Sequence, residues 1–149
     1  MKIAIGSDHA GFEMKEKIKK FLEDKGYEYQ DVGAEKLDPD DDYPVYGKKV
    51  AEAVASGDYD RGIAICGTGI GISIAANKVP GIRAAVCYNA DVAKMSRLHN
   101  DSNVLALGGR TIDKETALDI VGVWLETPFT EEERHKRRIQ QIKETENRR

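Results

Sequence analysis

The sequence predicts an α/β protein in which helices cover both faces of a mostly parallel, five-stranded sheet. Strand-like and helix-like segments alternate from the first residue, which is the pattern of such a sheet. Residues 62–66 are continuously apolar, as expected of a central strand buried on both faces. With 149 residues, 40% of them hydrophobic, the chain can bury one substantial core but not two. We therefore expect one domain over residues 1–149.

The first three elements follow from the local pattern of apolar residues. An apolar run predicts a strand over residues 3–7. A surface helix is expected next, because apolar residues recur at helical spacing among lysines and glutamates. These apolar residues are Phe12, Met14, Ile18, Phe21 and Leu22. Gly26 stands where a glycine commonly ends a helix, and residues 27–32 resemble a second strand.

The middle of the chain continues the alternation. The acidic stretch 33–43 contains a proline and predicts a loop. Pro44 suits the first turn of the next helix, which we expect to run to about Ser56. Residues 62–66 then form the third strand.

Two further strands and two helices complete the expected order. Apolar runs predict strands over residues 82–87 and 104–107. Asp113 is placed as the N-cap of a helix. The spacing of Thr130 and Glu133 predicts a capping box at the start of the last helix.

The last helix is unusually polar. Its apolar residues are mainly Ile139 and Ile142, so it cannot bury much surface against its own domain. We therefore expect it to reach over a partner subunit. Arg134 and Arg138 are four residues apart and share one helix face. A pair of guanidinium groups suits a phosphate, although a solvated charged face explains the spacing equally well.

Composition argues against several classes of protein. A net charge of −3 disfavours a general nucleic-acid binder. The sequence has no apolar run long enough to cross a bilayer, and its N-terminal segment lacks the pattern of a signal peptide. Two cysteines are too few for a disulfide framework or a zinc ribbon. We expect a cytoplasmic protein with free thiols and no membrane or nucleic-acid partner.

A cysteine followed by a glycine-rich loop is the strongest chemical signal. Cys66 ends the third strand, and Gly67, Gly69 and Gly71 follow at alternate positions. A thiolate can act as a base or nucleophile, and a loop of this kind can hold an anion with its amides. A lone buried cysteine is usually inert, and Cys87, which has no such loop, is expected in the core. The glycine spacing fits neither the dinucleotide fingerprint nor the P-loop.

Other polar residues fall where a ligand crevice is expected in an open α/β sheet, beyond the carboxyl ends of the strands. Asp8 and His9 follow the first strand, Cys66 the third and Arg110 the fifth, while residues 99–100 precede the fifth strand. We expect these four segments to converge on one cleft.

The histidines have both a structural and a catalytic interpretation. A histidine chosen at random is most often a hydrogen-bonded structural residue, but Asp8 beside His9 can orient its ring or share a proton. His99 opens a polar cluster before a buried strand. None of the three histidines has metal-binding spacing, so we expect no metal site.

Together, the motifs resemble the ribose-5-phosphate isomerase B family, which also contains galactose-6-phosphate and allose-6-phosphate isomerases. The motifs that carry the resemblance span nearly the whole chain: Gly6-Ser7-Asp8-His9-Ala10-Gly11-Phe12, Asp42-Tyr43-Pro44, Ile65-Cys66-Gly67-Thr68-Gly69-Ile70-Gly71, Ala75-Ala76-Asn77-Lys78, Gly81-Ile82-Arg83-Ala84, His99-Asn100, Asn103-Val104-Leu105 and Arg134-His135.

The resemblance implies a Rossmann-like, three-layer α/β/α sandwich. It also implies a homodimer or a dimer of dimers with active sites between subunits, and an aldose-ketose isomerase that acts on a sugar phosphate without a cofactor. The expected reaction interconverts ribose 5-phosphate and ribulose 5-phosphate in the pentose phosphate pathway.

The resemblance also assigns roles by position. Cys66 would be the base, and His99 would assist ring opening with Asp8. Thr68 and the amides of residues 67–71 would stabilise the enediolate. The expected phosphate ligands are His9, Arg110, Arg134 and Arg138, and the expected sugar contacts are Asn100 and Tyr43, with Gly67, Gly69, Ile70 and Gly71 in the binding loop. Some members use a glutamate later in the loop instead of the cysteine, but Ile72 occupies that place here.

Three alternatives stay open on the sequence. The substrate could be a six-carbon sugar phosphate, allose 6-phosphate or galactose 6-phosphate. The chain could be a flavodoxin-like module that binds a phosphorylated ligand without transforming it. It could also be a metal-dependent isomerase that uses the histidines.

Overall fold

In the computed structural model, which describes residues 1–146, five parallel strands form one sheet. The strands are β1 (Lys2–Ser7), β2 (Glu28–Asp31), β3 (Arg61–Cys66), β4 (Ala84–Val86) and β5 (Val104–Gly108). Their order across the sheet is β2-β1-β3-β5-β4. The predicted fold class is confirmed, and β3 occupies the central position expected of it.

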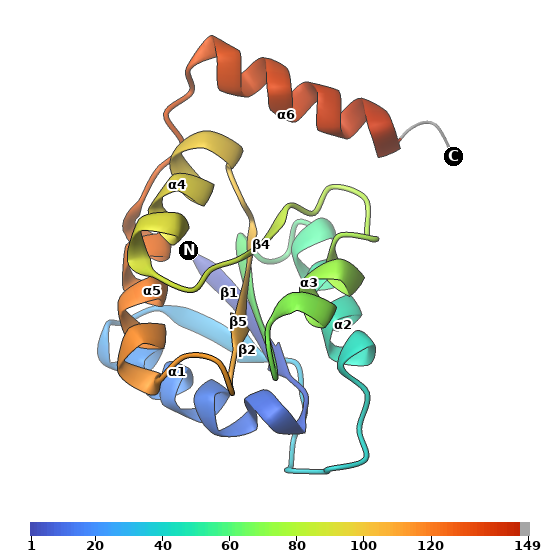
Figure 1. Cartoon of the computed structure of the whole chain (residues 1–149), viewed down its shortest axis with the longest axis vertical. Helices are drawn as coiled ribbons and strands as arrows, with labels where there is room; N and C mark the ends of the chain where they lie inside the picture. The colour runs from blue at the N-terminus through green and yellow to red at the C-terminus, as the bar shows by residue number, and fades with distance from the viewer. Residues whose placement is uncertain (147–149) are drawn as a thin grey trace.

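Helices form a layer on each side of the sheet. They are α1 (Phe12–Asp24), α2 (Tyr43–Ala55), α3 (Ile70–Ala76), α4 (Ala90–Asn100), α5 (Lys114–Glu126) and α6 (Glu133–Glu146), with a short 3₁₀ helix η1 (His9–Gly11). Figure 1 shows α1, α4 and α5 on one side and α2 and α3 on the other, while α6 lies across one end of the molecule. None of the helices between residues 1 and 146 combines the length and apolarity that a membrane span requires.

Several helix boundaries agree with the sequence signals. Gly26 adopts a left-handed φ of 80° just after α1, as a glycine at a helix C-terminus does. Pro44 lies in the first turn of α2. The Asp113 carboxylate accepts a hydrogen bond from the Thr116 N–H and caps α5. These signals act through a few neighbouring residues, which is why they could be recognised without the tertiary structure.

The two faces of the sheet carry side chains of different size. Large side chains pack toward α1, α4 and α5, whereas small ones pack toward α2 and α3. The first set is Ile3, Ile5, Ile63, Ile65, Leu105 and Leu107, and the second includes Ala64, Cys66, Val104 and Ala106. A Cβ added at Gly62 would lie 2.5 Å from Val50 Cγ1, so α2 lies directly on the backbone of β3. Cys66 therefore faces the α2 and α3 layer.

The sheet has a topological switch point between β1 and β3. From β1 the chain turns outward to β2 and then crosses back to β3 on the other side of β1. Ser7 pairs with Ile65 where these two strands end. In open α/β sheets the ligand crevice lies outside the carboxyl ends of the strands at such a point. The segments that follow Ser7 and Ile65 are therefore the place to look for a site.

Two predicted boundaries are wrong. The strand expected over residues 82–87 is paired only over Ala84–Val86. The capping box is also wrong, because Glu131 adopts a left-handed φ of 61° and α6 begins only at Glu133. Thr130 Oγ1 accepts instead from the Glu132 N–H, at 3.3 Å, in the turn before the helix.

Cys87 is a core residue, as expected. It is fully buried and belongs to the core on the α4 and α5 side of the sheet. Burial raises the pKa of its thiol to about 11, so the group stays neutral.

Candidate active site

Cys66 and the glycine loop form the centre of the candidate site. Cys66 is the last residue of β3 and is 4% exposed. Its Sγ accepts a hydrogen bond from the Gly69 N–H at 3.3 Å. Gly69 has a left-handed φ of 82°, and a Cβ there would lie 2.9 Å from the carbonyl carbon of Leu107. Only glycine fits this turn, which aims an amide at the sulfur.

The rest of the loop lies against a tyrosine from another element. Thr68 Oγ1 accepts from the Ile70 N–H at 3.2 Å. A Cβ at Gly71 would lie 2.6 Å from the Tyr43 ring, so the first residue of α2 packs on the loop. Thr68 and Tyr43 are both exposed residues.

Asp8 and His9 follow β1 at the same edge of the sheet. Asp8 is buried and caps η1, its Oδ1 accepting from the Gly11 N–H at 3.1 Å. Burial raises the pKa of the Asp8 carboxyl, and the hydrogen bond from Gly11 opposes this shift. His9 Nδ1 lies 2.7 Å from Asp41 Oδ1. Asp41 was not among the residues predicted from the sequence, because it is one of several aspartates in an acidic loop.

Arg110 follows β5 and joins the same cluster. Its N–H donates to the Gly67 carbonyl at 2.9 Å, and the Gly109 N–H donates to the Cys66 carbonyl at 2.8 Å. A Cβ at Gly67 would lie 3.9 Å from a guanidinium nitrogen of Arg110. Three of the four expected segments, those after β1, β3 and β5, thus meet at the carboxyl edge of the sheet.

The fourth segment lies at the opposite edge of the sheet. His99 and Asn100 end α4, just before β5 starts at Val104. Val104 pairs with Gly62 at the start of β3, whereas Cys66 lies at its end. This length of strand spans roughly 13 Å at about 3.3 Å a residue. The expectation that all four segments converge within one chain is therefore wrong, since α4 leads into the amino end of β5.

Arg134 and Arg138 are carried on α6, which packs beside His99. The His99 and His135 rings stack, with centroids 4.4 Å apart and planes 16° apart. Burial lowers the pKa of His135, and the neighbouring His99 and Arg134 act in the same direction. The two arginines are exposed. The amino edge of the sheet thus carries a second polar group made of His99, Asn100 and the two arginines.

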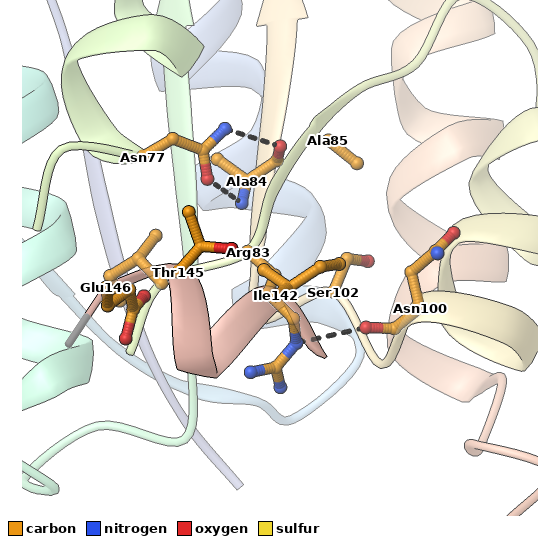
Figure 2. Close-up of a pocket in the computed structure, with 10 residues that line it drawn as sticks. Asn77, Arg83, Ala84, Ala85, Asn100, Ser102, Ile142, Thr145 and Glu146 are labelled. Atoms are coloured by element: carbon orange, nitrogen blue, oxygen red, sulfur yellow. Dashed lines mark hydrogen bonds between the residues drawn. The ribbon is translucent and has the colours of Figure 1, made fainter. Parts of the chain in front are cut away.

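A groove of about 640 Å³ lies between α6 and the amino end of β4. Figure 2 shows its lining, which includes Asn100 but no other predicted site residue. Several polar groups there are already paired: the Asn77 side chain bonds both backbone groups of Ala84, and Arg83 Nε donates to the Asn100 carbonyl. The candidate site is therefore the one at Cys66, where the Gly69 N–H donates to the thiol sulfur.

Asp8, His9 and Asp41 offer ligand atoms that lie within 4.8 Å of one another. The donor set would suit a divalent cation, but a hydrogen bond already joins His9 Nδ1 to Asp41. An ion at this position would have to displace that bond.

Comparison with known proteins identifies the family of the chain. The profile of the family described as Ribose/Galactose Isomerase matches residues 3–142. Ribose-5-phosphate isomerase B of Escherichia coli is 49% identical over 148 residues, covering 99% of this chain and 98% of the relative.

Solved structures show the same relationship. Ribose-5-phosphate isomerase B of Clostridium thermocellum superposes with a TM-score of 0.96 at 57% identity, covering 99% of this chain and 98% of the other. The enzyme from Mycoplasma genitalium, solved with bound ribulose-5-phosphate, gives a TM-score of 0.94 at 38% identity, with coverage of 99% and 97%. The chain therefore belongs to the ribose/galactose isomerase family and is a sugar isomerase.

Proposed function

We propose that this isomerase interconverts ribose 5-phosphate and ribulose 5-phosphate through an enediolate, with the Cys66 thiolate as the base. The observation that carries the proposal is the Gly69 N–H aimed at Cys66 Sγ, at 3.3 Å, beside the switch point of the sheet. A donor at this position stabilises negative charge on the sulfur. The names of the E. coli and C. thermocellum relatives and the ligand of the M. genitalium enzyme support the choice of substrate.

The chemistry balances without a cofactor. In the open-chain aldose the sulfur takes the proton from C2, the electrons of that C–H bond form the C1–C2 double bond, and O1 takes the negative charge. The hydroxyl proton then moves from O2 to O1, and the thiol returns its proton to C1. A carbonyl is left at C2. The net change is a shift of hydrogen within one molecule.

The glycine loop supplies donors for the oxygen that gains charge. The amides of residues 67–71 and the Thr68 hydroxyl lie next to Cys66. Preorganised donors of this kind are worth about 2.7–4 kcal/mol each in the transition state. Within the same chain, His9 and Arg110 are placed to bind the phosphate and Tyr43 the sugar.

A second copy of the chain completes the site in this proposal. His99, Asn100, Arg134 and Arg138 lie at the far edge of their own sheet, so they can act at Cys66 only from another subunit. Exposed apolar side chains on α3, α4 and the segment before α4 offer a surface for that contact. They are Ile70, Ile74, Tyr88, Val92 and Met95, which are 43–56% exposed. We infer a homodimer or a dimer of dimers, with the partner's His99 assisting ring opening.

The two free thiols support a reducing compartment, and we infer that the enzyme works in the cytoplasm.

Replacing the base tests the proposal. Cys66→Ala should lower turnover by roughly 10²–10⁴-fold and remove solvent exchange at C2 of ribose 5-phosphate in deuterated water. Cys87→Ala is the matched control, because it removes the other buried thiol. This variant should keep both turnover and solvent exchange at C2. Near-normal kcat in the Cys66 variant would show that the base is another group. The ratio of kcat/KM for ribose, allose and galactose phosphates decides between five-carbon and six-carbon substrates.

A further inference from the structure

Asp41 makes an unusually close contact with His9. It lies in the loop between β2 and α2, yet its Oδ1 accepts from the His9 N–H, at 3.0 Å, and lies 2.7 Å from the ring Nδ1. The Asp41 side chain is only 7% exposed. Its second oxygen, Oδ2, is buried without a hydrogen-bond partner among residues 1–146. A carboxylate buried in this way points to a role at His9, the residue that it contacts.

The contact with Nδ1 fixes the orientation of the His9 ring, and the contact with the backbone N–H fixes the residue that carries it. Because Nδ1 faces Asp41 Oδ1, Nε2 is the nitrogen left for a ligand. The His9 side chain is 25% exposed, which leaves part of the ring accessible to a ligand. The orientation of the His9 ring is thus set by a residue more than thirty positions away in the sequence.

The buried charge also determines what Nε2 can bind. A desolvated carboxylate with one unpaired oxygen is costly unless a positive charge lies beside it. The His9 ring lies at hydrogen-bond distance from Oδ1 and is the neighbour that can carry that charge. A phosphate dianion at Nε2 accepts a hydrogen bond from a proton on that nitrogen.

We propose that Asp41 is a positioning residue for phosphate binding, which holds the His9 ring through Nδ1 and presents the Nε2 proton to the phosphate of the sugar. The inference rests on the proposed function, which places the phosphate at His9. A simpler role for Asp41 would be to tie its loop to η1, and the two roles make different predictions.

A double-mutant cycle separates them. Asp41→Asn removes the charge while keeping the shape, and it should raise KM roughly tenfold or more with kcat nearly unchanged. His9→Gln should have a similar effect, and the double variant should be no worse than His9→Gln alone. Asp40→Asn is the matched control, since it removes an exposed aspartate from the same loop and should leave KM unchanged. If Asp41→Asn weakens binding by the same factor with and without His9, Asp41 only ties the loop and the proposal is overturned.

A measurement without turnover separates this inference from the proposed function. Nitrogen-15 NMR of the wild-type imidazoles should show a proton on His9 Nδ1, and inorganic phosphate should shift the His9 Nε2 signal. If the wild-type enzyme shows both effects but isomerises nothing, the proposed function fails and the role of Asp41 stands. If His9 carries its only proton on Nε2, the role of Asp41 fails, whether or not the Asp41 variant folds.

Discussion

Mixing two inactive variants should restore activity if the catalytic site is shared between subunits. The site at Cys66 lies at the carboxyl edge of the sheet, and His99 lies at the amino edge. If the proposed composite site exists, Cys66→Ala and His99→Asn damage its two halves. Each variant alone should be nearly inactive toward ribose 5-phosphate.

The expected recovery follows from the symmetry of a dimer. In a mixed dimer one site carries both substitutions, and the other combines Cys66 of one chain with His99 of the other. That second site is intact. Random mixing makes half of the dimers mixed, so the mixture should regain about one quarter of the wild-type activity. Mixed dimers purified through two different tags should have about half.

The assay is ribulose 5-phosphate formation after the two variants are unfolded together and refolded. The control is Cys66→Ala alone, unfolded and refolded in the same way. Full exchange of subunits, checked by the two tags, with no gain in activity would refute the shared site. It would mean that His99 acts elsewhere or not at all.

Four further predictions test separate parts of the site. Gly69→Ala should slow turnover by about 10²–10³-fold and lower the melting temperature, because the φ of 82° and the contact with Leu107 leave no room for a Cβ. His99→Asn should slow turnover of ribose 5-phosphate but spare solvent exchange at C1 of ribulose 5-phosphate, which is acyclic and needs no ring opening; equal loss of both would contradict the assigned role. Burial raises the pKa of the Asp8 carboxyl above its ordinary value of 3.8, so stability that is present below pH 3.8 is lost as the pH rises through the folded pKa. Asp8→Asn should thus raise the free energy of unfolding at about pH 7 but not at about pH 3, as measured by urea titration. Exhaustive chelation should leave the rate unchanged, and a loss that added metal restores would favour a metal-dependent reaction.

Much of the fold could be predicted because its signals are local. The continuous apolar run of β3 marked the central strand, and Gly26, Pro44 and Asp113 marked helix ends. The capping box failed because Thr130 and Glu133 have the right spacing, but the left-handed residue between them places the start of α6 later. Spacing indicates a cap only where the intervening backbone is already helical.

The candidate site was harder to predict because it depends on contacts between distant residues. Cys66 and its glycines could be found from spacing alone, since each lies within a few residues of the others. Asp41 could not be, because nothing in the loop distinguishes it from Asp38, Asp40 or Asp42 until the fold brings it to His9. The position of His99 was misjudged for a related reason. A residue before a parallel strand lies at the edge of the sheet opposite to a residue after it.

A site shared between subunits would also account for the composition of α6. This helix has 14 residues, of which only His135 and Ile139 are buried, and helices of this length are marginal in water without tertiary packing. The protein thus carries Arg134 and Arg138 on an element that receives little support from its own chain. A second subunit and a bound phosphate would supply the missing contacts. Completion of the site and ordering of the helix that holds the arginines would then occur together.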